Sequence, residues 1–133
     1  MGLAVFAAFA AMLGLFPFLS TYLTALGADA ALAGGVLAAY SAANVAGNWV
    51  GGLLADRWGR GLPLRVGLAG TGASLALYLV RRLDVVAGAH AVHGLMAGFV
   101  APAAFAWVGD RSLLAGRGTA MGRIGAAIAA AAV

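Results

Sequence analysis

The sequence contains no cysteine, no glutamate and no lysine. The absence of cysteine excludes a disulfide scaffold, a thiolate metal site and a cysteine nucleophile. Only 9% of the 133 residues are charged, as four aspartates and eight arginines, whereas a soluble domain carries roughly 25%. Because 64% of the residues are hydrophobic, too few polar side chains remain to cover an apolar core in water. Lipid is the solvent that fits this composition, and we expect an all-α membrane protein with the lipid bilayer as its surroundings.

Charged residues divide the chain into apolar blocks that predict membrane-spanning helices. About 20 apolar residues span a bilayer. The blocks that meet this length are 1–28, 30–55 and 85–109. The block at 66–80 is shorter, but Arg65 and Arg81 at its ends have long side chains that reach the interface. We therefore predict four transmembrane helices and the start of a fifth, over residues 3–26, 32–55, 63–81, 85–108 and 119–133.

The first block has one alternative interpretation, as a secretory signal peptide. Ala28, Asp29 and Ala30 have the small-x-small pattern of a cleavage site. However, no basic residue precedes the apolar run, and the run is longer than the core of a signal peptide. We therefore expect a transmembrane helix there.

The arginines gather in alternate connections between the blocks. Six lie in the connections after the second and fourth blocks, and Arg81 and Arg82 lie after the third. Cytoplasmic loops carry the excess of positive charge, which predicts a multi-pass protein of the plasma (inner) membrane with a cytoplasmic N-terminus. The net charge of +4 thus reports topology, and we expect no nucleic-acid partner.

The connection after the second block holds the most informative motif, Gly52-Leu-Leu-Ala-Asp56-Arg57-Trp-Gly59-Arg60. A helix must end here, turn and restart, and Gly59 permits a left-handed turn. The segment resembles the loop 2–3 signature of the major facilitator superfamily of transporters. The matching residues are Gly52, Leu54, Ala55, Asp56, Arg57, Gly59 and Arg60. The sequence departs from the signature at Gly61, where the family usually carries another basic residue.

A second resemblance to this family lies in the fourth block. Gly94, Gly98, Pro102 and Asp110 match a pattern of two glycines, a proline and an acidic exit from the membrane. His90 stands where the family usually has an intramembrane arginine, which argues against an arginine-based role in proton coupling. The stretch 16–48 is similar to drug and metabolite antiporters.

The resemblance implies a fold of twelve spans in two six-helix halves. The chain would then be an N-terminal fragment, part of the first six-helix half, with the remaining C-terminal helices as its partners. The implied function is transport of a small-molecule substrate by alternating access, as a secondary carrier with proton-coupled efflux. We expect no enzyme activity, no cofactor and no metal.

The resemblance also implies a cytoplasmic gate formed by Gly52, Asp56, Arg57, Gly59 and Arg60. In such a gate Asp56 meets the end of a helix from the second half of the transporter. The alternative is a solvated pair of charges, Asp56 and Arg57, that only fixes topology.

Polar residues inside the blocks are candidate contacts for protons or substrate. His90 and His93 are three residues apart and share a helix face, where they could contact protons or substrate, play a structural or interfacial role, or bind a metal. No carboxylate or third histidine stands near them for a metal site. Tyr40, Asn44 and Asn48 follow one another at helical spacing, which predicts a stripe that faces another helix or lines a pore.

Small residues at a spacing of four predict where helices pack closely. Such pairs are Gly47 with Gly51 in the second block, Gly94 with Gly98 in the fourth, and Gly118 with Gly122 at the start of the fifth helix. Pro102 removes a backbone hydrogen bond and should bend the fourth helix.

The competing hypothesis is a small four-helix oligomeric membrane protein or scaffold without autonomous transport. Small multidrug exporters resemble one another in a membrane glutamate, and this chain has no glutamate. A scaffold would leave the motif at 52–60 unexplained.

Overall fold

The computed structural model describes residues 2–130, except for the side chains at positions 2–9, 11–13, 114, 127 and 128. The helices are α1 (Gly2–Ala25), α2 (Ala30–Trp58), α3 (Gly61–Leu77), the 3-10 helix η1 (Tyr78–Val80), α4 (Leu83–Arg111), the 3-10 helix η2 (Leu114–Gly116) and α5 (Arg117–Ala130). The all-α prediction is therefore confirmed. Residues 131–133, the end of the predicted fifth helix, lie outside the described residues.

Three helical stretches among the described residues are long and apolar enough to cross a bilayer. They are Ala30–Trp58, Gly61–Val80 and Leu83–Arg111, and they correspond to the second, third and fourth predicted spans. The short third block reaches spanning length because α3 begins at Gly61 and η1 continues it. α1 has 24 residues and no charged side chain, and its span stays a prediction.

α2 is longer than predicted at both ends. Asp29 caps its start, because the side-chain Oδ1 accepts a hydrogen bond of 2.7 Å from the backbone N–H of Leu32. The helix continues through Trp58 and ends at Gly59, whose φ of 81° suits glycine. The helix therefore continues past the predicted end of the span at residue 55, and Asp56 belongs to its last turn and not to a loop.

The backbones of α2 and α4 pack against each other through glycines. A Cβ atom added to Gly47 would meet the backbone carbonyl of Leu95, and one added to Gly94 would meet that of Tyr40. The amide of Asn44 joins the same contact and donates a hydrogen bond of 3.1 Å to the carbonyl oxygen of Gly94. Gly51 lies against Phe99 and Gly98 lies against the backbone of α2, so the packing faces predicted on α2 and α4 are present. The third predicted face, at Gly118 and Gly122, is wrong for the described residues, because a Cβ atom at either position would meet nothing within 4 Å.

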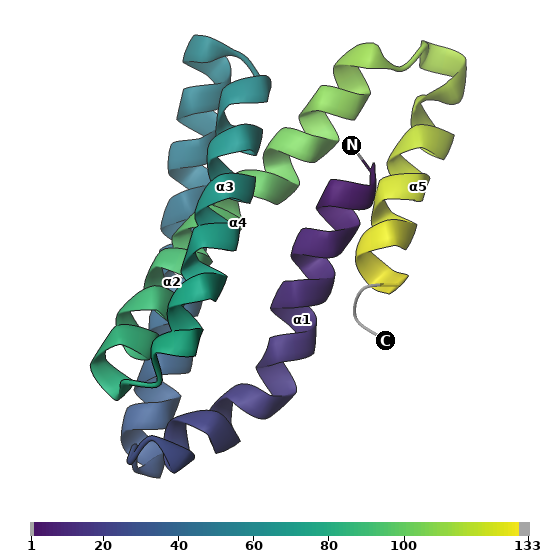
Figure 1. The fold of residues 1–133 in the computed structure, drawn as a ribbon. Coiled ribbons are helices and arrows are strands. Elements are labelled where there is room, and N and C mark those ends of the chain that lie inside the picture. The colour runs from purple at the N-terminus through teal and green to yellow at the C-terminus, as the bar shows by residue number, and fades with distance from the viewer. Residues whose placement is uncertain (1, 131–133) are drawn as a thin grey trace.

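α4 lies against both α2 and α3 in its first half. The contact continues past the middle of α4, since Phe99 lies against Gly51 of α2 and Val100 packs with Leu64 of α3. The last turns of α4 then lean toward α5 (Figure 1). α5 in turn packs against α1 and α4. Pro102 lies inside α4, and the bend expected there stays a prediction.

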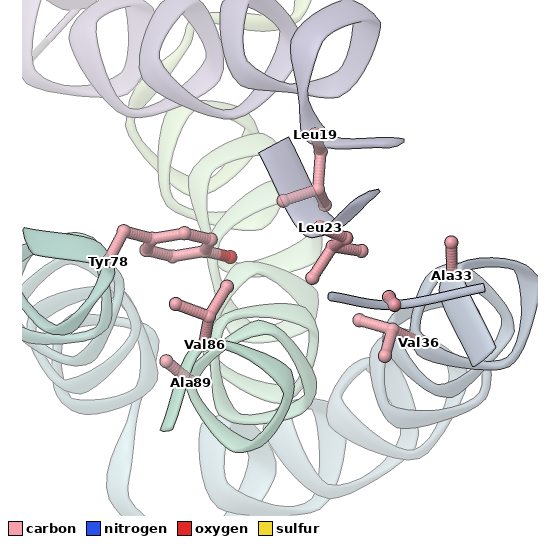
Figure 2. Packing of buried hydrophobic residues seen from close by; sticks show 8 residues of the cluster. Leu19, Leu23, Ala33, Val36, Tyr78, Val86 and Ala89 are labelled. Carbon is pink, nitrogen blue, oxygen red and sulfur yellow. The ribbon is translucent and has the colours of Figure 1, made fainter. Parts of the chain in front are cut away.

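A core of apolar side chains joins α1, α2, η1 and α4 at one end of the bundle. Leu19 and Leu23 of α1 meet Val36 of α2, Tyr78 of η1 and Val86 of α4 (Figure 2). This core fixes the position of η1, and with it the aromatic ring of Tyr78.

The connections between helices alternate between the two ends of the bundle. The α2–α3 turn and the α4–α5 connection lie at one end, and the α1–α2 and α3–α4 turns lie at the other (Figure 1). The two arginine-rich connections therefore share an end, as the sequence predicts for the same side of a membrane.

Candidate functional site

Three charged side chains meet where the α2–α3 turn approaches the end of α4. Arg60 Nη1 lies 2.9 Å from Asp56 Oδ1, and Arg60 Nε lies 3.5 Å from Asp110 Oδ2. We call these three residues the Asp–Arg–Asp cluster. It borders a hollow of about 480 Å³ between the two segments. The hollow is lined by Ala55, Asp56, Gly59, Arg60, Gly61, Trp107, Asp110 and Arg111.

Local structure brings the members of the cluster together. Asp56 stands in the last turn of α2, four residues before Arg60, and Gly59 between them turns the chain into α3. Asp110 stands in the last turn of α4. One guanidinium therefore links the end of α2 and the start of α3 to the end of α4.

The cluster is open to solvent. The side chains of Arg60, Asp56 and Asp110 are 35%, 73% and 60% exposed. Ion pairs this exposed contribute roughly 0–1 kcal/mol to stability. The cluster is consequently a weak link between helices, which can open and close at small energetic cost.

A second cluster is buried among α1, α2, η1 and α4. His90 and His93 are each 1% exposed, and Tyr40 and Tyr78 are 6% and 7% exposed. The Tyr78 hydroxyl lies 2.6 Å from His90 Nδ1 and 3.5 Å from His93 Nδ1. The Tyr40 ring stacks on His90 at a centroid distance of 4.7 Å, and the Phe16 ring meets Tyr40 edge-on at 5.1 Å. We call these five residues the His–Tyr cluster.

The two histidines are enclosed by protein, which bears on the roles predicted for them. Protein side chains enclose both imidazoles, and their depth relative to the membrane interface stays a prediction. The described residues contain no group of three or more histidine and aspartate side chains that could hold a metal ion. The Nε2 atoms of His90 and His93 are buried and have no hydrogen-bond partner, and such groups call for an explanation.

Comparison with known protein families identifies the family of the chain. The family model of the Major Facilitator Superfamily matches residues 1–133. The chain belongs to the major facilitator superfamily. No curated protein matches the chain.

Membership in the major facilitator superfamily makes this chain a multi-pass membrane protein of a transport family. Lipid is its surroundings and small molecules are the substrates that fit such a family. Proteins of this superfamily are generally not enzymes.

The predicted gate residues of this superfamily chain do not all join the Asp–Arg–Asp cluster. Arg57 lies over the ring of Trp58, with 5.5 Å between its Cζ and the ring centroid. A Cβ atom at Gly52 would meet open space, so Gly52 packs against no described neighbour. Arg111, which the sequence did not single out, lies 3.9 Å over the Trp107 ring beside the hollow.

The predicted polar stripe on α2 is correct in part. Tyr40 is buried in the His–Tyr cluster and Asn44 bonds Gly94 across the helix contact. Asn48 is exposed, and its amide donates to Asn44 O at 3.0 Å and Oδ1 at 3.1 Å. Asn48 therefore bonds its own helix and not a neighbouring one.

Sequence reasoning missed two features of the site. Asp110 was assigned only to the exit of the fourth helix, and its contact with Arg60 bridges 50 positions of the chain. Tyr78 was not singled out in the sequence as a site residue, but its ring is buried against the histidines. The spacing of 12 residues between Tyr78 and His90 crosses a turn, so helical periodicity gives no signal for their contact.

Proposed function

We propose that this chain acts in a secondary carrier that exports a small drug-like compound or metabolite in exchange for protons, by alternating access. In such carriers two halves rock around a midplane site. The observation that carries the proposal is the Asp–Arg–Asp cluster, in which Arg60 bridges Asp56 and Asp110. We place this end of the bundle, and the N-terminus, in the cytoplasm at the inner membrane, because the arginine-rich connections gather there.

The cluster has the properties that a gate requires. Its ion pairs are exposed and weak, so they can separate and reform during each transport cycle. Asp56 is the most exposed member and keeps acceptor positions for a helix end of the opposite half. Gly59 turns the chain after Asp56, Gly52 and Arg57 complete the gate motif within α2, and the hollow beside Arg60 is the space that the gate closes.

The His–Tyr cluster is our candidate for the proton site, and α2 offers contacts for the substrate. His90 and His93 are imidazoles, which titrate in the physiological range of pH when unperturbed. Tyr40 stacks on His90, and Asn44 lies one helical turn further along α2. The exposed Asn48 extends this polar line toward the cavity expected between the two halves.

The Asp56→Asn variant tests the gate. We express the whole reading frame that encodes this chain, reconstitute the product in vesicles, and measure the transport of a panel of drug-like cations that includes ethidium. The substitution keeps the size of the side chain and removes its charge, so we expect at least a tenfold lower rate with unchanged expression. A rate equal to that of the wild type would exclude a gating role for Asp56.

The matched control is Asp84→Asn. Asp84 pairs with Arg82 at the opposite end of the bundle, at 2.7 Å, and both side chains are more than half exposed. We expect this variant to transport at the wild-type rate. An equal loss in both variants would show that the effect follows from lost charge in general and not from the gate.

A further inference from the structure

One hydroxyl group stands between two buried imidazoles. Tyr78 Oη lies 2.6 Å from Nδ1 of His90 and 3.5 Å from Nδ1 of His93. A hydroxyl has a single proton to donate, and a neutral imidazole carries its proton on one of its two nitrogens. Tyr78 can therefore donate to one histidine and must accept from the other. When both rings are neutral, the two histidines must hold opposite tautomers to satisfy both contacts.

The shorter contact sets which tautomer each ring holds. We assign the hydroxyl proton to the bond with His90, whose proton then sits on Nε2. His93 carries its proton on Nδ1 and donates to Tyr78 Oη, so Nε2 of His93 is left as a bare lone pair. Both Nε2 atoms are buried and have no hydrogen-bond partner. One is thus a free donor and the other a free acceptor.

The surroundings of the pair contain no charge among the described residues. The rings that face the histidines are Phe16 from α1, Tyr40 from α2 and Tyr78 from η1. The two imidazole centroids are 6.3 Å apart. Two cations at this distance would repel each other without a carboxylate to offset them. The pair therefore has room for one excess proton and not for two.

We propose that His93, Tyr78 and His90 form a relay that carries one proton along α4, with the Tyr78 hydroxyl as the link between the two imidazoles. This inference rests on the proposed proton-coupled function and specifies the residues that move the proton. Tyr78 is the proton-transferring link that the sequence did not reveal.

The proton step balances without any further reactant. A proton from water binds the lone pair on Nε2 of His93, which becomes an imidazolium. The N–H bond at Nδ1 of His93 breaks as an O–H bond forms on Tyr78, and the original O–H bond of Tyr78 breaks as an N–H bond forms at Nδ1 of His90. His90 is then the imidazolium and releases its Nε2 proton to water. Tyr78 is neutral before and after, and the two rings have exchanged tautomers. The same steps run in reverse, and a second proton moves in the first direction only after both tautomers are restored.

Nitrogen NMR of the two histidines tests the relay directly. We label the product of the whole reading frame with 15N-histidine, assign the signals of His90 and His93 as those lost in His90→Asn and His93→Asn, and record spectra in micelles at a pH where both rings are neutral. We expect one ring with its proton on Nδ1 and the other with its proton on Nε2. In Tyr78→Phe we expect the Nδ1–H form to disappear. Two rings of the same tautomer in the wild type would overturn the proposal.

Two variants separate the relay from a merely structural role. Tyr22→Phe also removes a partly buried hydrogen bond, which the Tyr22 hydroxyl donates to the backbone oxygen of Tyr78 at 2.7 Å. This variant leaves the three relay residues unchanged. We expect its histidine spectrum to match the wild type. In His90→Asn the hydroxyl is free to donate to His93, and we expect His93 to move its proton from Nδ1 to Nε2. A His93 signal unchanged by both His90→Asn and Tyr78→Phe would contradict the relay.

Transport in vesicles distinguishes this inference from the proposed function. With ethidium outside and a pH-sensitive dye inside, proton-driven exchange should fall by about 10²-fold in Tyr78→Phe relative to Tyr22→Phe, as for loss of a proton-transferring group. If opposite tautomers are present but the wild type moves no protons, the relay geometry stands and the proposed function falls. If exchange is proton-driven and both tyrosine variants share one rate and one pH profile, the relay is overturned and the proposed function stands.

Discussion

Replacing Gly47 with alanine is expected to destabilise the packed α2–α4 pair by roughly 1–3 kcal/mol, the usual penalty for overpacking. The added methyl would meet the backbone carbonyl of Leu95, and a backbone cannot move aside as a flexible side chain can. In lipid this contact is a main source of stability, because helices associate there through close van der Waals packing rather than through the hydrophobic effect. Unfolding in mixed micelles of increasing SDS fraction measures the change.

The same helix supplies the control for Gly47. A Cβ atom at Gly34 would meet nothing within 4 Å. Gly34→Ala should therefore stabilise the protein by about 0.5–1 kcal/mol, since alanine is the better helix former. Opposite signs at the two positions would establish the helix contact. A Gly47→Ala protein as stable as Gly34→Ala would show that α2 and α4 do not touch at Gly47.

Replacing Arg60 with glutamine is expected to reduce transport by tenfold or more while leaving stability nearly unchanged. Arg60 is the only member of the Asp–Arg–Asp cluster that contacts both of the others, so its loss opens both ion pairs at once. Pairs this exposed contribute roughly 0–1 kcal/mol to folding. Initial transport rates measure the loss of transport, and SDS unfolding of the same preparation measures the change in stability.

A double substitution sharpens the test of Arg60. Because Asp110 acts through Arg60, the variant with both Arg60→Gln and Asp110→Asn should transport no worse than Arg60→Gln alone. Arg82→Gln, which removes an exposed arginine paired at the opposite end, serves as the control and should transport normally. Strictly additive losses, or an Arg60→Gln variant as unstable as Gly47→Ala, would contradict a gating link.

Much of the helical frame could be predicted from the sequence, because it follows from local rules. Apolar blocks between arginines mark the spans, and the glycine pairs at 47 and 51 and at 94 and 98 mark the close helix contact. The ends of the helices were predicted less accurately than their positions, because a charged side chain does not end a helix. α2 runs past Asp56 until Gly59, where the backbone takes a positive φ.

The polar stripe on α2 shows why helix faces are harder to predict than helices. Residues four apart on a helix of 3.6 residues per turn are offset by about 40°. Tyr40, Asn44 and Asn48 therefore drift around α2, from a buried position to a half-buried one and then to an exposed one. A line of polar residues at this spacing leaves the packed face after two turns.

The two clusters could not be assembled from spacing alone. Arg60 and Asp110 meet only because the α2–α3 turn and the end of α4 lie at the same end of the bundle. Tyr78 meets the histidines because the apolar core with Leu19, Leu23 and Val86 holds η1 against α4. Both contacts depend on how the helices are placed in three dimensions, which the periodicity of one helix does not report.

Single cysteines placed in this cysteine-free chain test the gate and its orientation directly, in the product of the whole reading frame with any other cysteine replaced by serine. Ala55 is buried and lines the hollow beside Arg60, and Leu79 is 82% exposed at the opposite end. Ala55→Cys and Leu79→Cys are reacted with a membrane-impermeant maleimide from each side of the membrane, with and without Asp56→Asn. The gate predicts that Ala55→Cys reacts only from the cytoplasmic side and several-fold faster with Asp56→Asn, while Leu79→Cys reacts from the outside at an unchanged rate. Labelling of Ala55→Cys from the outside, or at a rate that Asp56→Asn does not change, would contradict a cytoplasmic gate at this end of the bundle.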